Sequence, residues 1–431
     1  MTTPARGEAP PHPDAAPAPV RRARLALVLV TAGLLAVAAG LAALRPPWGF
    51  ETGPFFPAPD ARGFRATVWI ALFWASLANA AVAALGAATA HRWARPLPPA
   101  RPWAPPPRLR PALAVLLALA ALLALGLRAP LASGSLWWDE IWSLTRVIRG
   151  PLEPDPQDPA RLELEDRSWA RTLWYYRKPT NHVLYNVAAR AALDAWRDVR
   201  GAPPAAFDER VFRAPALAAA ALAVVALGLL GWRAGFPRAG VAAAFLLAIH
   251  PWHLRYGVEG RAYSLLVLFT VVACLGLMEA LRTGRPRGFA LAGAGIVGLL
   301  WTHPFSAYFV GILAVAGLAG ALRAPVGRER RRGLAWRWLA TNALAGMVFV
   351  QAMAPNLAQA MTWPNVWEED RQALRQAVDW WGETATGIPV RCAADDRPED
   401  PYPCVMGMAE DAAWPVAVVW VVLPLLFALG L

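Results

Sequence analysis

Long apolar runs recur from one end of the chain to the other, and they constrain its fold more than any other feature. A run of about 20 apolar residues forms a helix long enough to cross a bilayer. The runs are continuous, whereas the strands of membrane barrels alternate apolar and polar residues. The sequence therefore predicts an all-α, polytopic transmembrane helix bundle in place of several soluble domains.

The apolar runs predict about ten spans. They cover residues 25–44, 67–90, 111–131, 213–231, 238–252, 262–281, 288–302, 305–322, 334–354 and 413–431. A cleaved signal peptide is the alternative for the first run, although its length favours a retained anchor. The chain ends inside the last run, which indicates a partial sequence.

Charges between the runs predict the orientation. The connection 91–110 carries five arginines and no acid, and the later inside connections are also rich in arginine. Basic residues concentrate in cytoplasmic loops, so we expect a multi-pass protein of the inner (cytoplasmic) membrane with its N-terminus inside. The expected parts are a disordered cytoplasmic tail (1–24), two N-terminal spans with a basic cytoplasmic loop (25–110), a membrane core (111–355), an outer acidic loop (356–412) and the last span (413–431).

The net charge of +12 does not indicate a nucleic-acid partner, because the arginines lie between the spans, where membrane topology explains them. The expected partner is the lipid bilayer. Among the three cysteines, Cys274 lies inside an apolar run and suits packing. Cys392 and Cys404 flank an acidic, proline-rich stretch outside the cytoplasm, where a disulfide can form.

The segment 132–212 is the first large outer loop. Residues 139–149 predict a short amphipathic helix, and the four prolines of residues 151–159 predict irregular structure there. Thr180 or Asn181 can cap a second helix that runs to about Val199. We expect these to be amphipathic surface helices along the outer face of the membrane.

Polar clusters gather at the outer ends of the predicted spans. Asp139 and Glu140 stand between aromatic residues just past a span, where an acidic pair must face water. The other candidates are Lys178 and His182 in the outer loop, His253, Arg255, Glu259, Arg261 and Tyr263 after the fifth span, and His303 at a later helix end. A carboxylate can take a proton from a hydroxyl, and arginines can bind phosphate.

Each candidate also has a structural alternative. The acids at 139 and 140 can stabilise a helix N-terminus through the helix dipole. Arg255 and Glu259 are four residues apart and can form an ordinary ion pair. The four histidines of the outer connections can be polar helix ends with no substrate contact.

The chain resembles the membrane glycosyltransferases of the GT-C superfamily over roughly residues 111–355. It is most similar to the bacterial dolichyl-phosphate-mannose protein mannosyltransferases and to the lipid A aminoarabinose and lipopolysaccharide-core sugar transferases. The residues that match are Asp139 and Glu140 in the first outer loop, then Arg213, Ala214 and Pro215, then His250, Pro251, Tyr256, Glu259, Arg261, Tyr263, Ser264 and Leu265. Two extra spans before the acidic loop, and Asn181-His182 in place of a second proline, depart from the family pattern.

The resemblance implies an inverting sugar transfer from a polyprenyl-phosphate donor. Asp139 would then be the catalytic base, with Glu140 as its helper or as the ligand of a divalent metal. Arg255, Arg261 and Lys178 would bind the donor phosphate. The substrate-binding residues would include His182, His253, Glu259, Tyr263 and His303. The acceptor can be protein, lipid or polysaccharide.

Two other functions fit the same sequence. A transporter or flippase of a lipid-linked glycan would also be polytopic, but it would place ionisable residues in mid-span, and here the charges lie at span ends. A non-catalytic membrane protein of envelope assembly is the third alternative.

Overall fold

The structure is a computed structural model, and it describes residues 17–46, 59–98, 110–155, 157–158, 162–176 and 181–360, with side chains from residue 63 onward in the second range. The predicted last span, both cysteines of the predicted disulfide, and most of the acidic segment 356–412 lie outside these residues, as does Lys178. The described part is about 81% helical, which confirms an all-α membrane architecture.

Within the described residues, six helices are long and apolar enough to cross a membrane. These are α1 (Ala18–Leu44), α2 (Pro59–Ala88), α4 (Pro111–Arg128), α8 (Glu209–Ala234), α11 (Tyr263–Thr283) and α13 (Ser306–Arg323). Three more predicted spans coincide with α9 (Pro237–Ile249), α12 (Pro286–Thr302) and α14 (Arg328–Ala360). At 13 and 17 residues, α9 and α12 are short for a crossing, and α14 begins with several arginines, so the total of about ten stays a prediction.

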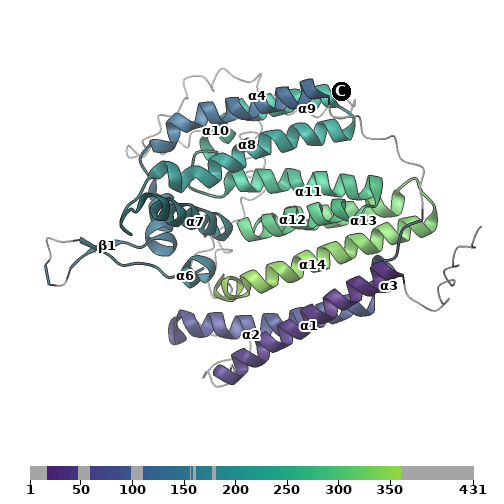
Figure 1. Cartoon of the computed structure of the whole chain (residues 1–431), viewed down its shortest axis with the longest axis horizontal. Coiled ribbons are helices and arrows are strands. Elements are labelled where there is room, and N and C mark those ends of the chain that lie inside the picture. The colour runs from purple at the N-terminus through teal and green to yellow at the C-terminus, as the bar shows by residue number, and fades with distance from the viewer. Residues whose placement is uncertain are drawn as a thin grey trace, which may run out of the picture.

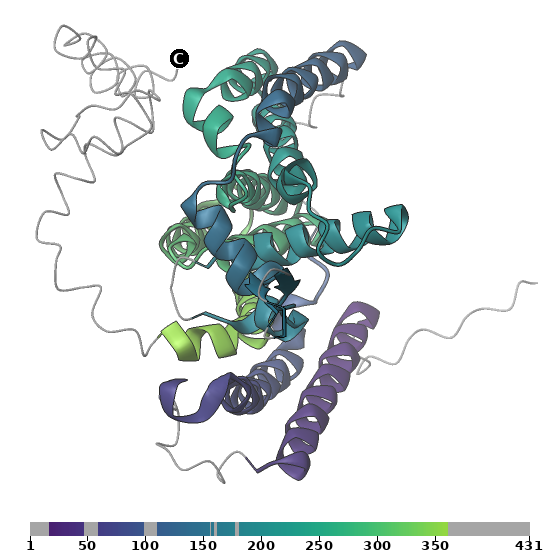
Figure 2. The ribbon, with the colours of Figure 1, turned by 90° about the vertical axis from the view of Figure 1, so that its left-hand side faces the viewer.

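The long helices lie side by side as one bundle (Figure 1). Neighbouring pairs include α4 with α8, α8 with α11, α11 with α12, and α12 with α14. The N-terminal pair α1–α2 lies at one side of the bundle and joins it through α2 and α14 (Figures 1 and 2). Asn79 of α2 donates to the Gln351 side chain of α14 at 2.9 Å, a polar link of the kind that joins helices in lipid.

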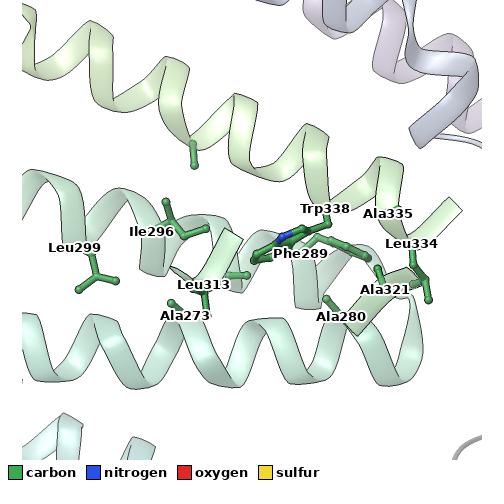
Figure 3. Packing of buried hydrophobic residues seen from close by; sticks show 12 residues of the cluster. Ala273, Ala280, Phe289, Ile296, Leu299, Leu313, Ala321, Leu334, Ala335 and Trp338 are labelled. Carbon is green, nitrogen blue, oxygen red and sulfur yellow. The ribbon is translucent and has the colours of Figure 1, made fainter. Parts of the chain in front are cut away.

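The largest apolar core joins α11, α12, α13 and α14. Trp338 of α14 is 1% exposed and lies beside Phe289 and Leu313 (Figure 3). Its indole N–H donates to the carbonyl of Ala314 at 2.8 Å, so this large ring is buried with its one polar group satisfied.

The α11–α12 contact depends on small residues. A Cβ added at Gly276 would lie 2.2 Å from the backbone nitrogen of Ala292, and one added at Gly295 would lie 2.6 Å from that of Ala273. Glycines of this kind let two helix backbones approach closely in a membrane.

Gly276→Ala is therefore expected to destabilise the protein by roughly 1–3 kcal/mol, because the added methyl group pushes the two helices apart. Gly311→Ala on α13 is the matched control, since no atom lies within 4 Å of its added Cβ. Thermal unfolding of both variants in one detergent checks this, and equal midpoints would contradict the close contact.

The connections between the long helices separate into two ends. At one end, Arg337 donates to the carbonyls of Trp93, Arg95 and Gly284. Arg330 donates to the carbonyls of Pro98 and Thr283 at the same end, near the short helix α3 (Ala90–Trp93). The basic connections predicted to be cytoplasmic thus pack together.

The outer segment lies at the opposite end (Figure 1). The predicted helix 139–149 is confirmed as α5 (Trp138–Ser143) followed by a π-helical turn (Leu144–Ile148), and the second predicted helix is α7 (Val183–Arg200). The short helices α6 (Trp169–Trp174) and α10 (Pro251–Tyr256) lie at this end too.

Two local predictions for this segment were wrong. Part of the proline-rich stretch forms the strand β1 (Leu152–Pro154), which pairs antiparallel with β2 (Leu162–Leu164). A two-stranded ribbon tolerates Pro154 because each strand has an unpaired edge. His182, and not Thr180 or Asn181, is the N-cap residue of α7, while the Asn181 side chain donates to the carbonyl of Tyr175.

Candidate functional site

The buried carboxylate of Glu140 connects three segments of the chain. Its Oε1 accepts from Nε of Arg213 at 2.8 Å and from the backbone N–H of Gly260. Its Oε2 accepts from a terminal nitrogen of Arg213 at 2.6 Å and from the backbone N–H of Trp137 at 3.1 Å. These four bonds use the four acceptor positions of a carboxylate. Glu140 is fully buried, so its geometry is that of a structural anchor for α5, α8 and the 257–262 loop.

Arg213 is equally satisfied. Beyond the two bonds to Glu140, it donates to the carbonyls of Ala132, Gly134 and Ser135 at 2.7–3.0 Å. All five guanidinium N–H groups therefore have an acceptor. The arginine lies in the first turns of α8 and fixes the end of the α4–α5 connection, a role that its match to a family motif did not reveal.

Asp139 faces the opposite way from its neighbour. Its side chain is 39% exposed, and its Oδ2 lies 3.4 Å from a terminal nitrogen of Arg261. Arg261 is only 3% exposed and also donates to Ser143 Oγ at 3.2 Å and to the Tyr263 hydroxyl. Among the described residues, the second Asp139 oxygen has no hydrogen bond or ion pair.

Two histidines lie next to this pair. The Nδ1 atom of His182 accepts from the backbone N–H of Ala262 at 3.0 Å, which places the ring proton on Nε2. The ring contacts Tyr263 and His303, with centroids 5.3 and 5.0 Å away. Burial, then the positive charge of Arg261, lowers the pKa of both His182 and His303. The two rings are therefore neutral N–H donors at neutral pH.

Arg255 and Glu259 form the outer part of the site. Arg255 Nε donates to Glu259 Oε1 at 3.2 Å, and the Arg255 side chain is 45% exposed. Its guanidinium lies over the rings of Trp252 and Tyr256, at 5.6 and 5.5 Å. The Oε2 atom of Glu259 is buried without a hydrogen-bond partner in the described structure. Burial raises the pKa of Glu259 to about 7, although Arg255 acts in the opposite direction.

Glu259→Gln is expected to change how stability depends on pH. Folding raises the pKa of Glu259 from 4.5 to about 7. The stability that the protonated carboxyl contributes is fully present below about pH 4.5, and it is lost as the pH rises through about 7. At roughly 1.4 kcal/mol per pKa unit, the loss is about 3 kcal/mol. The neutral amide has no such dependence, so the variant should gain stability relative to the wild type between about pH 4 and pH 8.

Thermal unfolding of both proteins across this range measures the difference. The wild-type curve alone is not enough, because His253 also titrates in this range. Burial lowers the pKa of His253 to about 4, so this histidine makes the folded protein less stable as the pH falls. Glu153→Gln, at an exposed position of β1, is the control and should follow the wild type at every pH. An E259Q curve that stays parallel to the wild type would contradict the ionisation of Glu259.

His253 does not belong to this cluster. Its Nδ1 lies 2.7 Å from a terminal nitrogen of Arg128, which also donates to the carbonyls of Ala124, Ala248 and His253. Arg128 is fully buried, and these bonds join α4, α9 and α10. His253 is thus placed in a helix-packing contact.

The structure brings most of the sequence candidates together. Asp139, Arg261, Tyr263, His182 and His303 form one connected group, and the Arg255–Glu259 pair joins it through Tyr256, whose ring lies 4.6 Å from that of Tyr263. Glu140 and His253 point elsewhere, and Lys178 is outside the described residues. Ser143 and Trp252 contact Arg261 and Arg255 of this group, and no sequence pattern predicted a role for either. Among the described residues, no group of three or more His, Cys, Asp or Glu side chains is placed to hold a metal ion.

Comparison with protein-family models, with curated proteins and with solved structures finds no match to this chain.

Proposed function

We propose that the chain is a membrane glycosyltransferase of the GT-C type. It would transfer a sugar from a polyprenyl-phosphate donor to an acceptor hydroxyl, with inversion, at the outer face of the cytoplasmic membrane. The orientation rests on the charge pattern, because the basic connections pack together at the end opposite Asp139. The six apolar helices found in the described part of the chain support the membrane setting of this reaction.

The observation that carries the proposal is the environment of Asp139. One carboxylate oxygen lies 3.4 Å from Arg261, and the side chain is 39% exposed. Two neutral histidines lie near the same arginine. Such a carboxylate can accept the proton of a hydroxyl that attacks the sugar. The acceptor oxygen bonds to the anomeric carbon, the bond from that carbon to the phosphate oxygen breaks with its electron pair, and the proton goes to Asp139.

Arg255 is better placed than Arg261 for the departing phosphate. Arg261 is buried and already bonded to Asp139, Ser143 and Tyr263. Arg255 is half-exposed, and it rests on two aromatic rings that hold its guanidinium at the surface of the site. The neutral N–H group of the half-buried His303 suits a sugar hydroxyl, whereas His182 is 1% exposed and packs against that ring.

A reconstituted assay tests the activity directly. Vesicles that contain the full chain receive a labelled polyprenyl-phosphate sugar, and both the glycosylated acceptor and the position of the label across the bilayer are measured. Label in an acceptor supports transfer. Movement of intact donor without transfer supports a flippase, and the absence of both supports a non-catalytic role.

A further inference from the structure

A deep apolar groove lies at the basic end of the bundle, between α12 and α14. Its volume is about 510 Å³. Small side chains on both helices leave the space, and they include Ala290, Gly293, Ala294, Ala340, Thr341 and Ala345. Pro19 of α1 and Trp93 of α3 also line the groove. None of the candidate-site residues lines it, so the groove does not belong to the proposed reaction.

The groove has the depth of one bilayer leaflet. Its lining extends along α12 from Pro286 to Val297 and along α14 from Arg337 to Val348. Eleven residues of helix rise by roughly 16 Å. Half of a hydrocarbon core about 30 Å thick is nearly the same distance. An acyl chain that entered from the basic end would therefore fill the groove lengthwise.

The rim of the groove is positively charged. Arg337 lines it and donates to the uncharged carbonyls of Trp93, Arg95 and Gly284. Arg22 is exposed one helical turn after Pro19. No carboxylate is among the described lining residues. Basic pockets between spans on the cytoplasmic side are suited to anionic lipid headgroups.

We propose that this groove binds one anionic phospholipid, with an acyl chain between α12 and α14 and the phosphate at the arginine rim. The combination of an apolar channel one leaflet deep and a cationic mouth selects this occupant over a zwitterionic lipid. The proposal does not depend on the glycosyltransferase activity.

Native mass spectrometry of the full chain, released from detergent with phosphatidylglycerol or phosphatidylcholine, tests the proposal. The wild type should retain one phosphatidylglycerol in strong preference to phosphatidylcholine. Ala294→Phe fills the groove and should abolish this retention, while Leu291→Phe, on the same helix outside the lining, should keep it. Arg22→Gln should weaken retention roughly fivefold.

Several results would overturn the proposal. Equal retention of both lipids would contradict selection of an anionic headgroup. Unchanged binding in A294F would show that the lipid does not bind in this groove. If inorganic phosphate alone displaces the lipid, the site is an anion site without an acyl chain. If no lipid is retained and A294F lowers the unfolding temperature far more than L291F, another part of the chain fills the groove.

Discussion

Asp139→Asn is expected to reduce sugar transfer by a factor of about 10²–10⁴, the range that a positioned general base contributes. Asparagine has nearly the same shape as aspartate but cannot accept the proton. The 3.4 Å ion pair with Arg261 is also lost, and Arg261 is only 3% exposed, so the variant should lose some stability as well, and the rate is compared per amount of folded protein. The reconstituted assay with labelled polyprenyl-phosphate sugar measures the rate.

Asp166→Asn is the matched control for this variant. Asp166 lies in the same outer segment, is 68% exposed and is 3.9 Å from Arg190. It should retain wild-type transfer. If D139N transfers sugar at the wild-type rate, with equal amounts of folded protein, Asp139 is not the catalytic base. The proposed function would then be contradicted.

Arg213→Gln is expected to destabilise the protein by about 3–5 kcal/mol, because it leaves the carboxylate of Glu140 buried without its charged partner. The double variant E140Q/R213Q should be more stable than R213Q alone, since the uncompensated charge is then absent. Chemical or thermal unfolding in detergent compares the three proteins. Sugar transfer should fall along with stability in R213Q, because α5 carries Asp139.

Arg210→Gln is the control for the arginine substitution. Arg210 is exposed on the first turn of the same helix, and its loss should change stability by no more than about 0.5 kcal/mol. If R213Q unfolds at the same point as R210Q, the Glu140–Arg213 pair does not hold the outer segment.

Much of the helical architecture could be predicted from the sequence, because apolar length decides which segments can cross a bilayer. The ranges of α4, α8, α11 and α13 lie close to the predicted spans. The span count was harder to predict because α14 starts with a charged turn and α9 is short. The short β1–β2 ribbon was missed, since backbone pairing of three residues leaves almost no pattern in side chains.

For the site, the sequence predicted which segments meet but not how their charges pair. Asp139 and Glu140 are adjacent in the chain, yet consecutive residues on a helix point in directions about 100° apart. One therefore faces solvent and the other faces Arg213. The partners of Glu140 lie 73 and 120 residues further along, and no local spacing identifies such a contact. The anchoring contact of His253 with Arg128, 125 residues away, was hidden for the same reason.

The contacts of Glu140 also have a consequence for biosynthesis. Except for the nearby N–H of Trp137, every donor to this carboxylate is translated later than Glu140 itself, and the last of them is Gly260. Until the ribosome has delivered that glycine, the acid lacks part of its final environment and has to remain hydrated. The region around α5 can therefore reach its native conformation only after α8 and α10 have been synthesised.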